Sequence, residues 1–307
     1  MEFYWGHWME RVNLAIIILN WNGIADTLEC LKSLSQCLVA FTFPYEIIVV
    51  DNNSQDESIP ILQKQPGITA LLNRENRGFA AGVNSGIKLA QEHGANFFVI
   101  LNNDTILDTN FLMPLLEVFQ KDPKAGIAAP KIKYYSPDNR LWFAGGAFRW
   151  PRIIGRMIGL DEVDQKKYDC IKTIDFATGC CMLFSDSLIQ NIGLFDERFF
   201  FYQEDIDFSF RAGKAGFTIW YQPLSVIRHK VAQSTKNDIP LRLFYQGQSR
   251  MLFFRKHIHG IKYCLVLGFE LIRLIRTAIS CLGYQNRNAL IQSYIKGLWS
   301  GYKEIIN

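Results

Sequence analysis

Residues 14–22 read LAIIILNWN, a run of six apolar residues that ends in a polar turn. The β-branched side chains and the short length predict a buried parallel strand. The same arrangement recurs at residues 45–53, YEIIVVDNN, and at residues 97–104, FFVILNND. Helical spacing separates these runs, over residues 28–34 and 78–91. Strands that alternate with helices predict an α/β fold with a parallel sheet covered on both faces.

Polar residues follow each of the three strands. Ligands of open α/β sheets bind just outside the carboxyl ends of the strands, so we expect residues 20–22, 51–53 and 102–104 to line one crevice. Asp51 could accept hydrogen bonds from a nucleobase or a ribose, or it could simply cap a turn. Asp104 could hold Mg²⁺ or Mn²⁺, which prefer oxygen ligands, or it could cap the next helix.

Further candidates lie later in the chain. Glu204, Asp205 and Asp207 follow the aromatic run FFFY at residues 199–202 and open a predicted helix. Carboxylates there either stabilise the positive end of the helix dipole or include a general base, with the aromatic run as a sugar-stacking wall. His229 follows a predicted strand and lies between two basic residues. It is either a metal ligand beside a diphosphate or an ordinary surface or core histidine.

Two less regular segments complete the main body. Residues 76–82, NRGFAAG, open a helix whose small residues would let backbone N–H groups approach a phosphate. Residues 134–169 are rich in glycine, proline and charge, which predicts a hairpin or a loop.

The C-terminal residues 261–283 are strongly apolar but interrupted by charges. A membrane-spanning helix needs about 20 nearly uncharged residues. The polar residues fall within an arc of about 120° on a helix; they are Lys262, Glu270, Arg273, Arg276 and Ser280. This pattern favours an amphipathic helix that lies in the plane of a membrane surface. The alternative is a helix that packs in a soluble C-terminal bundle.

Composition limits the function classes. The chain has 307 residues and a formal net charge of +4, without the dense basic stripe of a nucleic-acid binder. Its seven cysteines form no C-x-x-C pair, which argues against a zinc site, and their odd number argues against a disulfide framework. Residues 1–11 lack the pattern of a signal peptide and are expected to form a short tail. We therefore expect a cytoplasmic protein.

Taken in order, seven stretches resemble the family 2 glycosyltransferases with the GT-A fold, and most closely the rhamnosyltransferase-like enzymes of bacterial polysaccharide assembly. They read LAIIILNWNG, YEIIVVDNNSQDES, NRENRGFAAGVNSGI, FFVILNNDT, TGCCMLF, GLFDERFFFYQEDIDFSFR and IRH. The resemblance covers about residues 12–230. It implies a GT-A catalytic domain at residues 12–238, with a Rossmann-like, mostly parallel sheet flanked by helices. A helical, membrane-associating extension would follow at residues 239–307.

The resemblance also implies site residues. Asp205 would be the general base, in a pair with Glu204, and Asp104 and His229 would hold the metal, Mg²⁺ or Mn²⁺. The donor-binding residues would be Asn20, Asn22, Asp51, Asn53, Asn76, Gly78, Asn84, Asn102 and Asn103. The metal triplet of the family is often Asp-x-Asp, whereas here it reads Asn102-Asn103-Asp104. One carboxylate remains, so metal coordination would depend more on His229 and the donor phosphates.

The activity implied is an inverting, metal-dependent transfer of a sugar from a nucleotide-diphosphate donor to an acceptor hydroxyl. The subgroup suggests rhamnose as the sugar. A glycan or lipid-linked glycan acceptor, and a peripheral position at the inner face of the cell membrane, would fit the helix at residues 261–283 and the cytoplasmic location. One alternative is a nucleotidyltransferase acting on sugar phosphates, but the first strand lacks the glycine-rich loop of such enzymes. The other is a non-catalytic, membrane-attached scaffold, which the missing first acid of the triplet would suit.

Overall fold

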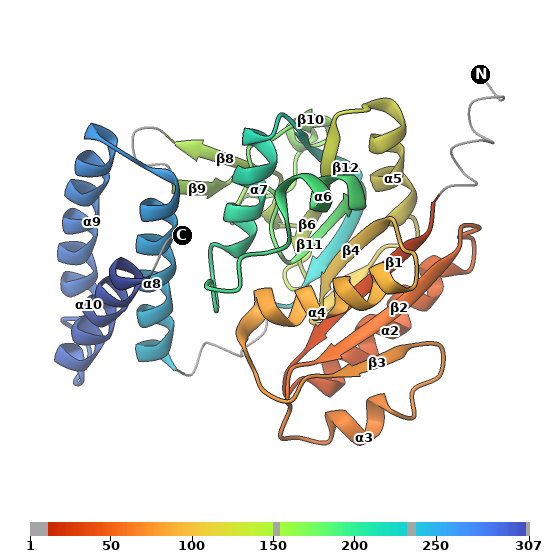
Figure 1. The fold of residues 1–307 in the computed structure, drawn as a ribbon, viewed down its shortest axis with the longest axis horizontal. Helices are drawn as coiled ribbons and strands as arrows, with labels where there is room; N and C mark the ends of the chain where they lie inside the picture. Colours follow the sequence, from red (N-terminus) through yellow and green to blue (C-terminus); the bar gives the residue numbers. More distant parts are fainter. Residues whose placement is uncertain (1–11, 150–153, 232–237, 305–307) are drawn as a thin grey trace.

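The computed structural model describes residues 12–149, 154–231 and 238–304 (Figure 1). The expected tail at residues 1–11 lies outside the described residues. A large sheet forms the centre of the molecule, and the last three helices form a separate layer at one end (Figure 1).

Four parallel strands, in the order β3-β2-β1-β4, form the half of the sheet that the sequence predicts. They are β1 (Leu14–Asn20), β2 (Tyr45–Asp51), β3 (Thr69–Leu72) and β4 (Phe97–Asn102). In the register, Asn20 lies opposite Asp51, and Leu19 lies opposite Asn102. The polar residues after these strands therefore meet at one edge of the sheet.

The other half of the sheet is mixed. β11 (Cys181–Ser185) runs antiparallel to both β4 and β6 (Ala125–Tyr134), and β6 pairs in parallel with β12 (Thr218–His229). The shorter strands that pair antiparallel with β6 or β12 are β5 (Thr105–Leu107), β7 (Leu141–Phe143) and β10 (Lys172–Thr173). Because β11 is antiparallel, its beginning rather than its end lies beside the polar end of β4.

Helices cover both faces of the sheet. α4 (Gly78–Glu92) packs on β1 and β2, where Gly86 brings the helix against Ile17 and Val50, and α2 (Ile24–Leu38) lies on the opposite face (Figure 1). The remaining helices of this part are α3 (Ser58–Leu62), α5 (Leu112–Lys121), the 3₁₀ helix η1 (Lys166–Tyr168), α6 (Asp186–Ile192) and α7 (Glu204–Lys214). The segment predicted as a hairpin or loop contains the hairpin of β8 (Gly146–Arg149) and β9 (Ile154–Met157).

The C-terminal helices are α8 (Ile239–His257), α9 (Ile261–Ser280) and α10 (Arg287–Lys303). α10 lies close against α8, because Gly297 and Gly301 of α10 leave room for the backbone carbonyls of Phe244 and Gln248. No helix within the described residues is long and apolar enough to cross a membrane.

Candidate functional site

The turn after β1 is joined to the turn after β2 by a buried polar network. Asn20 Nδ2 donates to Asp51 Oδ2 at 2.7 Å, and the hydroxyl of Ser54 donates to the same oxygen at 2.7 Å. The backbone N–H of Ser54 donates to Asp51 Oδ1 at 2.8 Å. Both carboxylate oxygens of Asp51 thus accept hydrogen bonds within the protein, and its side chain is buried. This geometry matches the turn-capping alternative for Asp51.

Two asparagines of these turns adopt left-handed backbone conformations, with φ of 50° at Asn22 and 64° at Asn53. Asparagine tolerates this region better than most residues. Asn22 also links the turns, since its N–H donates to Ser54 Oγ at 2.8 Å and its Oδ1 accepts from the N–H of Gln55 at 2.7 Å. The two polar turns therefore form one structural unit at the edge of the sheet.

Asn52, which lies in the expected crevice but is not among the donor-binding residues that the resemblance implies, connects this unit to α4. Its Nδ2 donates to Asn76 Oδ1 and to the carbonyl of Gly78, each at 3.0 Å. Asn73 Nδ2 donates to Asn52 Oδ1 at 3.0 Å. The signal for Asn52 was its place between Asp51 and Asn53, but strand-end position alone does not distinguish three consecutive polar residues.

The start of α4 packs against protein backbone. The N–H of Gly78 donates to Asn76 Oδ1 at 2.9 Å, and the N–H of Phe79 donates to the carbonyl of Phe200 at 3.0 Å. Gly78 has a φ of 89°, and a Cβ at this position would overlap the carbonyl of Phe200. The small residue is thus required by the approach of the 200–203 loop. The first two amides of α4, expected to face a phosphate, are already hydrogen bonded inside the protein.

Asn84 lies one and a half turns into α4 and binds a different segment. Its Nδ2 donates to the carbonyl of Phe195 at 2.8 Å and to Glu197 Oε1 at 3.1 Å, and its Oδ1 accepts from the N–H of Phe195 at 3.1 Å. The side chain is buried, and its oxygen and nitrogen are both engaged. We therefore leave Asn84 out of the proposed donor site.

The asparagines after β4 also differ in their surroundings. Asn103 Nδ2 donates to the hydroxyl of Thr27 at 3.0 Å, at the start of α2. The backbone of Asn102 binds on both sides, with its N–H donating to the carbonyl of Cys180 at 2.9 Å and its carbonyl accepting from the Thr105 hydroxyl at 2.7 Å. These contacts fix the turn that presents Asp104.

Asp104 and His229 come together although 125 positions separate them in the sequence. Asp104 Oδ2 lies 3.1 Å from His229 Nε2, and both side chains are buried. The antiparallel pairing of β5 with β12 places His229 opposite Thr105, directly beside Asp104. The ring of His229 packs edge-on against Trp142, with the ring centroids 4.6 Å apart, and its buried Nδ1 has no hydrogen-bond partner.

The basic neighbours of His229 bind carboxylates of the protein. Lys230 Nζ lies 2.6 Å from Asp26 and 2.5 Å from Glu29, and Arg228 pairs with Asp108. These ion pairs attach the end of β12 to α2 and to the turn after β5.

The acidic pair opens α7 from a strained turn. Tyr202 and Gln203 both have left-handed backbones, with φ of 71° and 68°. Such conformations are costly for residues other than glycine and gather at functional sites. They aim Glu204 and Asp205 back toward the start of β11, where Asp205 Oδ2 accepts from the N–H of Gly179 at 2.9 Å.

Burial changes the acidity of both carboxyls. It raises the pKa of Glu204 well above the usual value, and the adjacent Asp205 carboxylate adds to the rise. One carboxylate oxygen of Glu204 is buried without a hydrogen-bond partner. Burial also raises the pKa of Asp205, while the N–H groups of Gly179 and Ile206 oppose that rise. Glu204 is therefore favoured in the protonated form and Asp205 in the ionised form.

The turn at residues 178–180 bridges the two acidic centres. Gly179 binds Asp205, and the next residue, Cys180, accepts a hydrogen bond from Asn102. The carboxylates of Asp104 and Asp205 both raise the pKa of the buried Cys180 thiol, after the larger effect of burial itself. Asp104 and Asp205 thus both lie near this one turn.

The pair of Asp104 and His229 fits a divalent ion only as a partial ligand set. Two neighbouring ligands, each about 2.1 Å from an octahedral ion, lie about 3.0 Å apart, which is close to the 3.1 Å between Oδ2 and Nε2. Within the described residues no group of three His, Cys, Asp or Glu side chains could hold a metal. Phosphate oxygens or water would have to complete the coordination.

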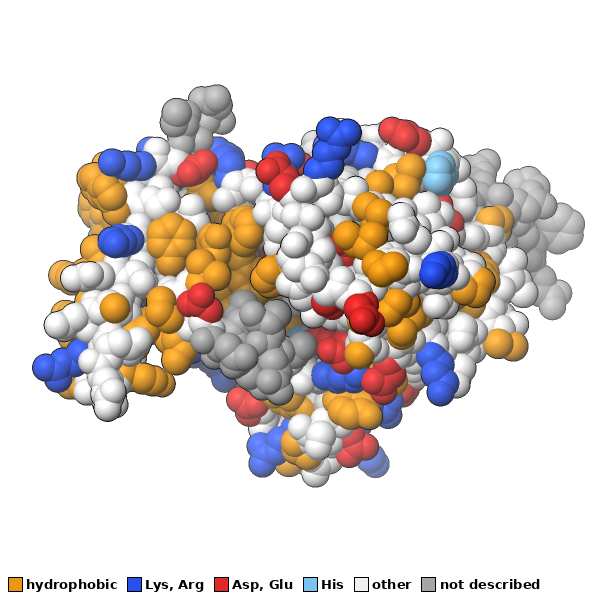
Figure 2. Space-filling model, turned by 90° about the horizontal axis from the view of Figure 1, so that it is seen from below, with side chains coloured by type: hydrophobic (Ala, Val, Ile, Leu, Met, Phe, Trp, Pro, Cys, Tyr) orange, Lys and Arg blue, Asp and Glu red, His pale blue; other side chains and the backbone are white. Residues whose placement is uncertain are grey.

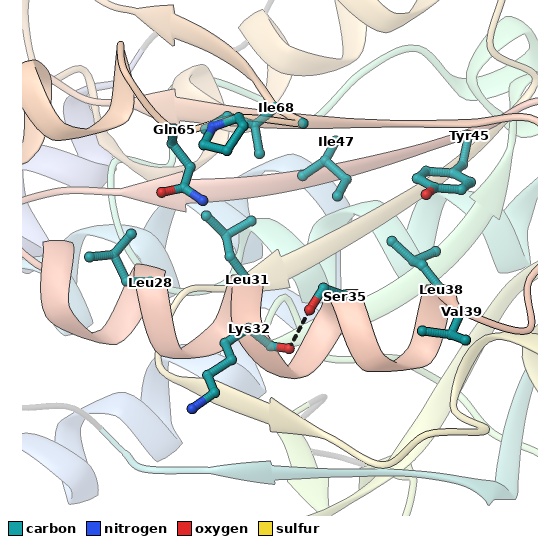
Figure 3. Close-up of a pocket in the computed structure, with 12 residues that line it drawn as sticks. Leu28, Leu31, Lys32, Ser35, Leu38, Val39, Tyr45, Ile47, Gln65 and Ile68 are labelled. Carbon is teal, nitrogen blue, oxygen red and sulfur yellow. Dashed lines mark hydrogen bonds between the residues drawn. The ribbon is translucent and has the colours of Figure 1, made fainter.

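A cavity of about 430 Å³ lies away from these residues, between α2 and the strand β2 (Figure 3). Its lining includes Leu28, Leu31 and Ile47 and contains no carboxylate. It lacks the acidic groups that the chemistry at the sheet edge would use, so we do not assign the site to it.

This chain is similar to known glycosyltransferases. The model of the family described as glycosyl transferase family 2 matches residues 15–193. The hexosyltransferase Agl10 of low-salt glycan biosynthesis in Haloferax volcanii is 26% identical over 274 residues, which cover 86% of this chain and 85% of that protein. The N-acetylglucosaminyl-diphospho-decaprenol L-rhamnosyltransferase of Mycobacterium tuberculosis is 26% identical over 252 residues, which cover 75% of this chain and 80% of that protein.

Among solved structures, the mannosyltransferase PcManGT of Pyrobaculum calidifontis, in complex with GDP-Man and Mn²⁺, superposes with a TM-score of 0.57 at 15% identity. The superposition covers 98% of this chain and 93% of that one. This likeness confirms the predicted GT-A fold. The family match covers more than half of the chain, and we set aside the nucleotidyltransferase and the scaffold. The chain belongs to glycosyl transferase family 2 and is a glycosyltransferase of glycan or polysaccharide biosynthesis.

Proposed function

We propose that the enzyme transfers a sugar, with inversion, from a nucleotide-diphosphate donor to a hydroxyl of a glycan or lipid-linked glycan. The observation that carries this proposal is the turn at residues 178–180, which binds Asp205 on one side and the strand that leads to Asp104 on the other. Donor phosphates near Asp104 and an acceptor hydroxyl near Asp205 would then flank the same anomeric carbon. We further propose a catalytic domain at residues 12–238 and a helical extension at residues 239–307.

Asp205 is the proposed general base. Its carboxylate is held by two backbone N–H groups, which fix its direction and support its ionised form. Burial raises its pKa, and a base whose pKa moves toward the working pH accepts a proton more readily. Asp205 would take the proton from the acceptor hydroxyl while the oxygen attacks the anomeric carbon. The nucleoside diphosphate leaves from the opposite face, so a single displacement inverts the configuration.

Glu204 is proposed to assist in its neutral form. Burial raises the pKa of this carboxyl well above its usual value, which favours the neutral form and avoids a second charge beside Asp205. A neutral carboxyl can donate a hydrogen bond to a sugar hydroxyl. The proposed donor-side residues act mostly through the turns that they stabilise. They are Asn20, Asn22, Asp51, Asn53, Asn76, Gly78, Asn102 and Asn103.

Asp104 and His229 are proposed to hold Mg²⁺ or Mn²⁺. The fit rests on the 3.1 Å separation of their ligand atoms. Two protein ligands also leave coordination positions of the ion for diphosphate oxygens. When bound, the ion would neutralise charge on the departing diphosphate as a Lewis acid. The mannosyltransferase with the same fold was solved with Mn²⁺.

Rhamnose is the proposed sugar, and a polyprenyl-diphosphate-linked glycan is the proposed acceptor, because the mycobacterial relative carries both in its name. We also propose that the reaction takes place in the cytoplasm, with the enzyme held peripherally at the inner face of the membrane. All seven cysteines are free, which is compatible with a reducing compartment.

The substitution Asp205→Asn tests the proposal. We expect turnover of a nucleotide-sugar donor to fall by about 100-fold or more, since general bases contribute rate factors of about that size. Donor affinity, measured by calorimetry, should change little. Asp138→Asn, at an exposed turn, serves as the control. Near-normal turnover in the Asp205 variant would exclude it as the base.

A further inference from the structure

α9 is attached to the protein through its polar side. Val266 and Glu270 are its buried residues, 1% and 4% exposed. Glu270 pairs with Arg250 of α8 and accepts a hydrogen bond from the hydroxyl of Tyr294 of α10 at 3.3 Å. Glu270 therefore faces the bundle, whereas Lys262 and Arg276 of the same polar arc are exposed.

The opposite side of α9 is apolar and exposed. Five large aliphatic residues, between 47% and 76% exposed, fall within an arc of about 80° at the helical spacing of about 100° per residue. They are Ile261, Leu265, Ile272, Ile275 and Ile279. We call this set the α9 face. The only other helix position in this arc is Gly268, so no charge interrupts it. Exposed apolar patches of this kind mark interaction sites.

Positive charge accompanies the α9 face. Lys262 and Arg276 lie at one of its edges, both exposed. Residues 239–304 contain ten Lys and Arg but only two Asp and Glu, a formal charge of +8, whereas the whole chain carries only +4. The rest of the chain is therefore net acidic. Figure 2 shows hydrophobic side chains gathered over the C-terminal helices, with Lys and Arg around them.

We propose that the α9 face docks on an anionic lipid bilayer, with the helix lying in the plane of the interface. Apolar side chains would enter the acyl boundary, and the neighbouring cations would meet the negative headgroups. Charge complementarity decides for lipid over a second copy of the chain, because a second copy would bring another region of charge +8 against the first. The inference rests on the proposed function only in that a lipid-linked acceptor explains why the enzyme docks.

Contacts of α8 connect this surface to the site. Ser249 Oγ donates to the carbonyl of Phe201 at 2.8 Å, and the ring of Tyr245 stacks on Phe200 with centroids 4.7 Å apart. These contacts hold the 200–203 loop, which leads into Glu204 and Asp205. A bilayer below α9 would therefore hold the acidic pair at a fixed orientation to the membrane.

Vesicle flotation tests the proposal with the full chain. The wild type is mixed with vesicles of phosphatidylcholine and phosphatidylglycerol, and separately with vesicles of phosphatidylcholine alone. We expect strong binding to the anionic vesicles and a loss of binding as salt is raised. The double variant Ile272→Glu and Ile279→Glu should bind them about tenfold more weakly or worse. Leu224→Glu, at an aliphatic residue of β12 that is 71% exposed, is the matched control and should bind as the wild type does.

A second readout separates the two proposals. Thermal stabilisation by nucleotide sugar and Mn²⁺ should be equal in all three proteins, which also shows that the variants fold. Equal vesicle binding by wild type and double variant would overturn the docking proposal and leave the transferase proposal standing. The docking proposal would also be overturned if the wild type failed to bind vesicles and eluted as a dimer in size-exclusion chromatography, while the double variant eluted as a monomer. Vesicle binding without stabilisation by any donor would count against the proposed function instead.

Discussion

Gly78 illustrates how one residue connects the proposed donor side of the site to the proposed acceptor side. Its N–H binds Asn76, its carbonyl accepts from Asn52, and its bare Cα admits the carbonyl of Phe200. The sequence suggested a phosphate as the reason for the small residue. The structure assigns the same smallness to packing, because the approaching group is backbone of the protein itself.

Gly78→Ala should therefore destabilise the fold more than an alanine at another left-handed glycine. Gly216 is the matched case, since its φ of 87° resembles the 89° of Gly78 but a Cβ there would meet nothing within 4 Å. We expect about 1 kcal/mol for Gly216→Ala from backbone strain alone, and about 1–3 kcal/mol more for Gly78→Ala from steric overlap. Urea denaturation measures both changes in the free energy of unfolding. Equal losses in the two variants would show that the 200–203 loop moves aside at little cost.

The raised pKa of Glu204 leads to a prediction about how the stability of the fold depends on pH. Its folded-state pKa is raised by burial, so the folded protein binds a proton that the unfolded chain releases at its ordinary pKa. The resulting stability is complete below about pH 4.3 and declines as the pH rises toward the folded-state pKa. Glu204→Gln should therefore flatten the fall of melting temperature between about pH 5 and pH 8.

Asp196 supplies a control of opposite sign. Although burial acts to raise its pKa, hydrogen bonds from Arg198 and Lys256 hold it far below the usual value. The stability from this carboxylate is present above the unfolded pKa and is lost only in more acidic solution. Asp196→Asn should thus alter the profile below about pH 4 and leave the slope above pH 5 unchanged. A Glu204→Gln profile parallel to that of the wild type would contradict the raised pKa.

At the scale of elements, α7 is held in place by ion pairs between Asp207 and α8. Asp207, one turn after the strained entry, is fully buried and accepts from Arg211 of its own helix. It also binds two residues of α8, with His257 Nε2 at 2.7 Å and Lys256 Nζ at 2.8 Å. The pKa of Asp207 is lowered, since these partners outweigh the effect of burial. Asp207 thus joins α7 to α8.

Asp207→Asn should loosen that junction. Removing this buried charge leaves Arg211 without the carboxylate of Asp207, although Lys256 keeps Asp196. Breaking a buried ion pair in this way costs about 3–5 kcal/mol. Asp169→Asn is the control, because Asp169 is exposed and its partner Lys131 keeps a second carboxylate, Asp164; a change within about 0.5 kcal/mol is expected there. Guanidinium unfolding measures both. A loss below about 1 kcal/mol at Asp207 would mean that the junction is held by apolar packing alone.

At the scale of the whole molecule, the site exists only where distant segments meet. Its proposed metal pair joins the turn after β4 to the end of β12, and its acidic pair reaches back to the start of β11. A ligand that touches all of these segments binds the folded state and not the unfolded chain. Binding should therefore raise the stability of the entire chain.

A donor together with Mn²⁺ should accordingly raise the melting temperature. A ligand present at about 100 times its dissociation constant adds about 2.7 kcal/mol, which for a chain of this size amounts to a few degrees. Asp104→Asn should reduce the part of the rise that depends on Mn²⁺. Mn²⁺-dependent stabilisation that persists in this variant would exclude Asp104 as a ligand. A screen of nucleotide sugars in the same assay would identify the donor.

The sequence by itself determined the parallel strands, the polar turns that follow them and the family, because these depend on local apolar runs and on motifs that are contiguous in the chain. The tertiary structure decided which groups meet: Asp104 with His229, Asp207 with α8, and Glu270 with Arg250. It also showed β11 to be antiparallel and Asn84 to be bound to Phe195. Periodicity shows that a helix has two sides, but only packing against neighbouring helices decides which residues are buried, and in α9 these are Val266 and Glu270.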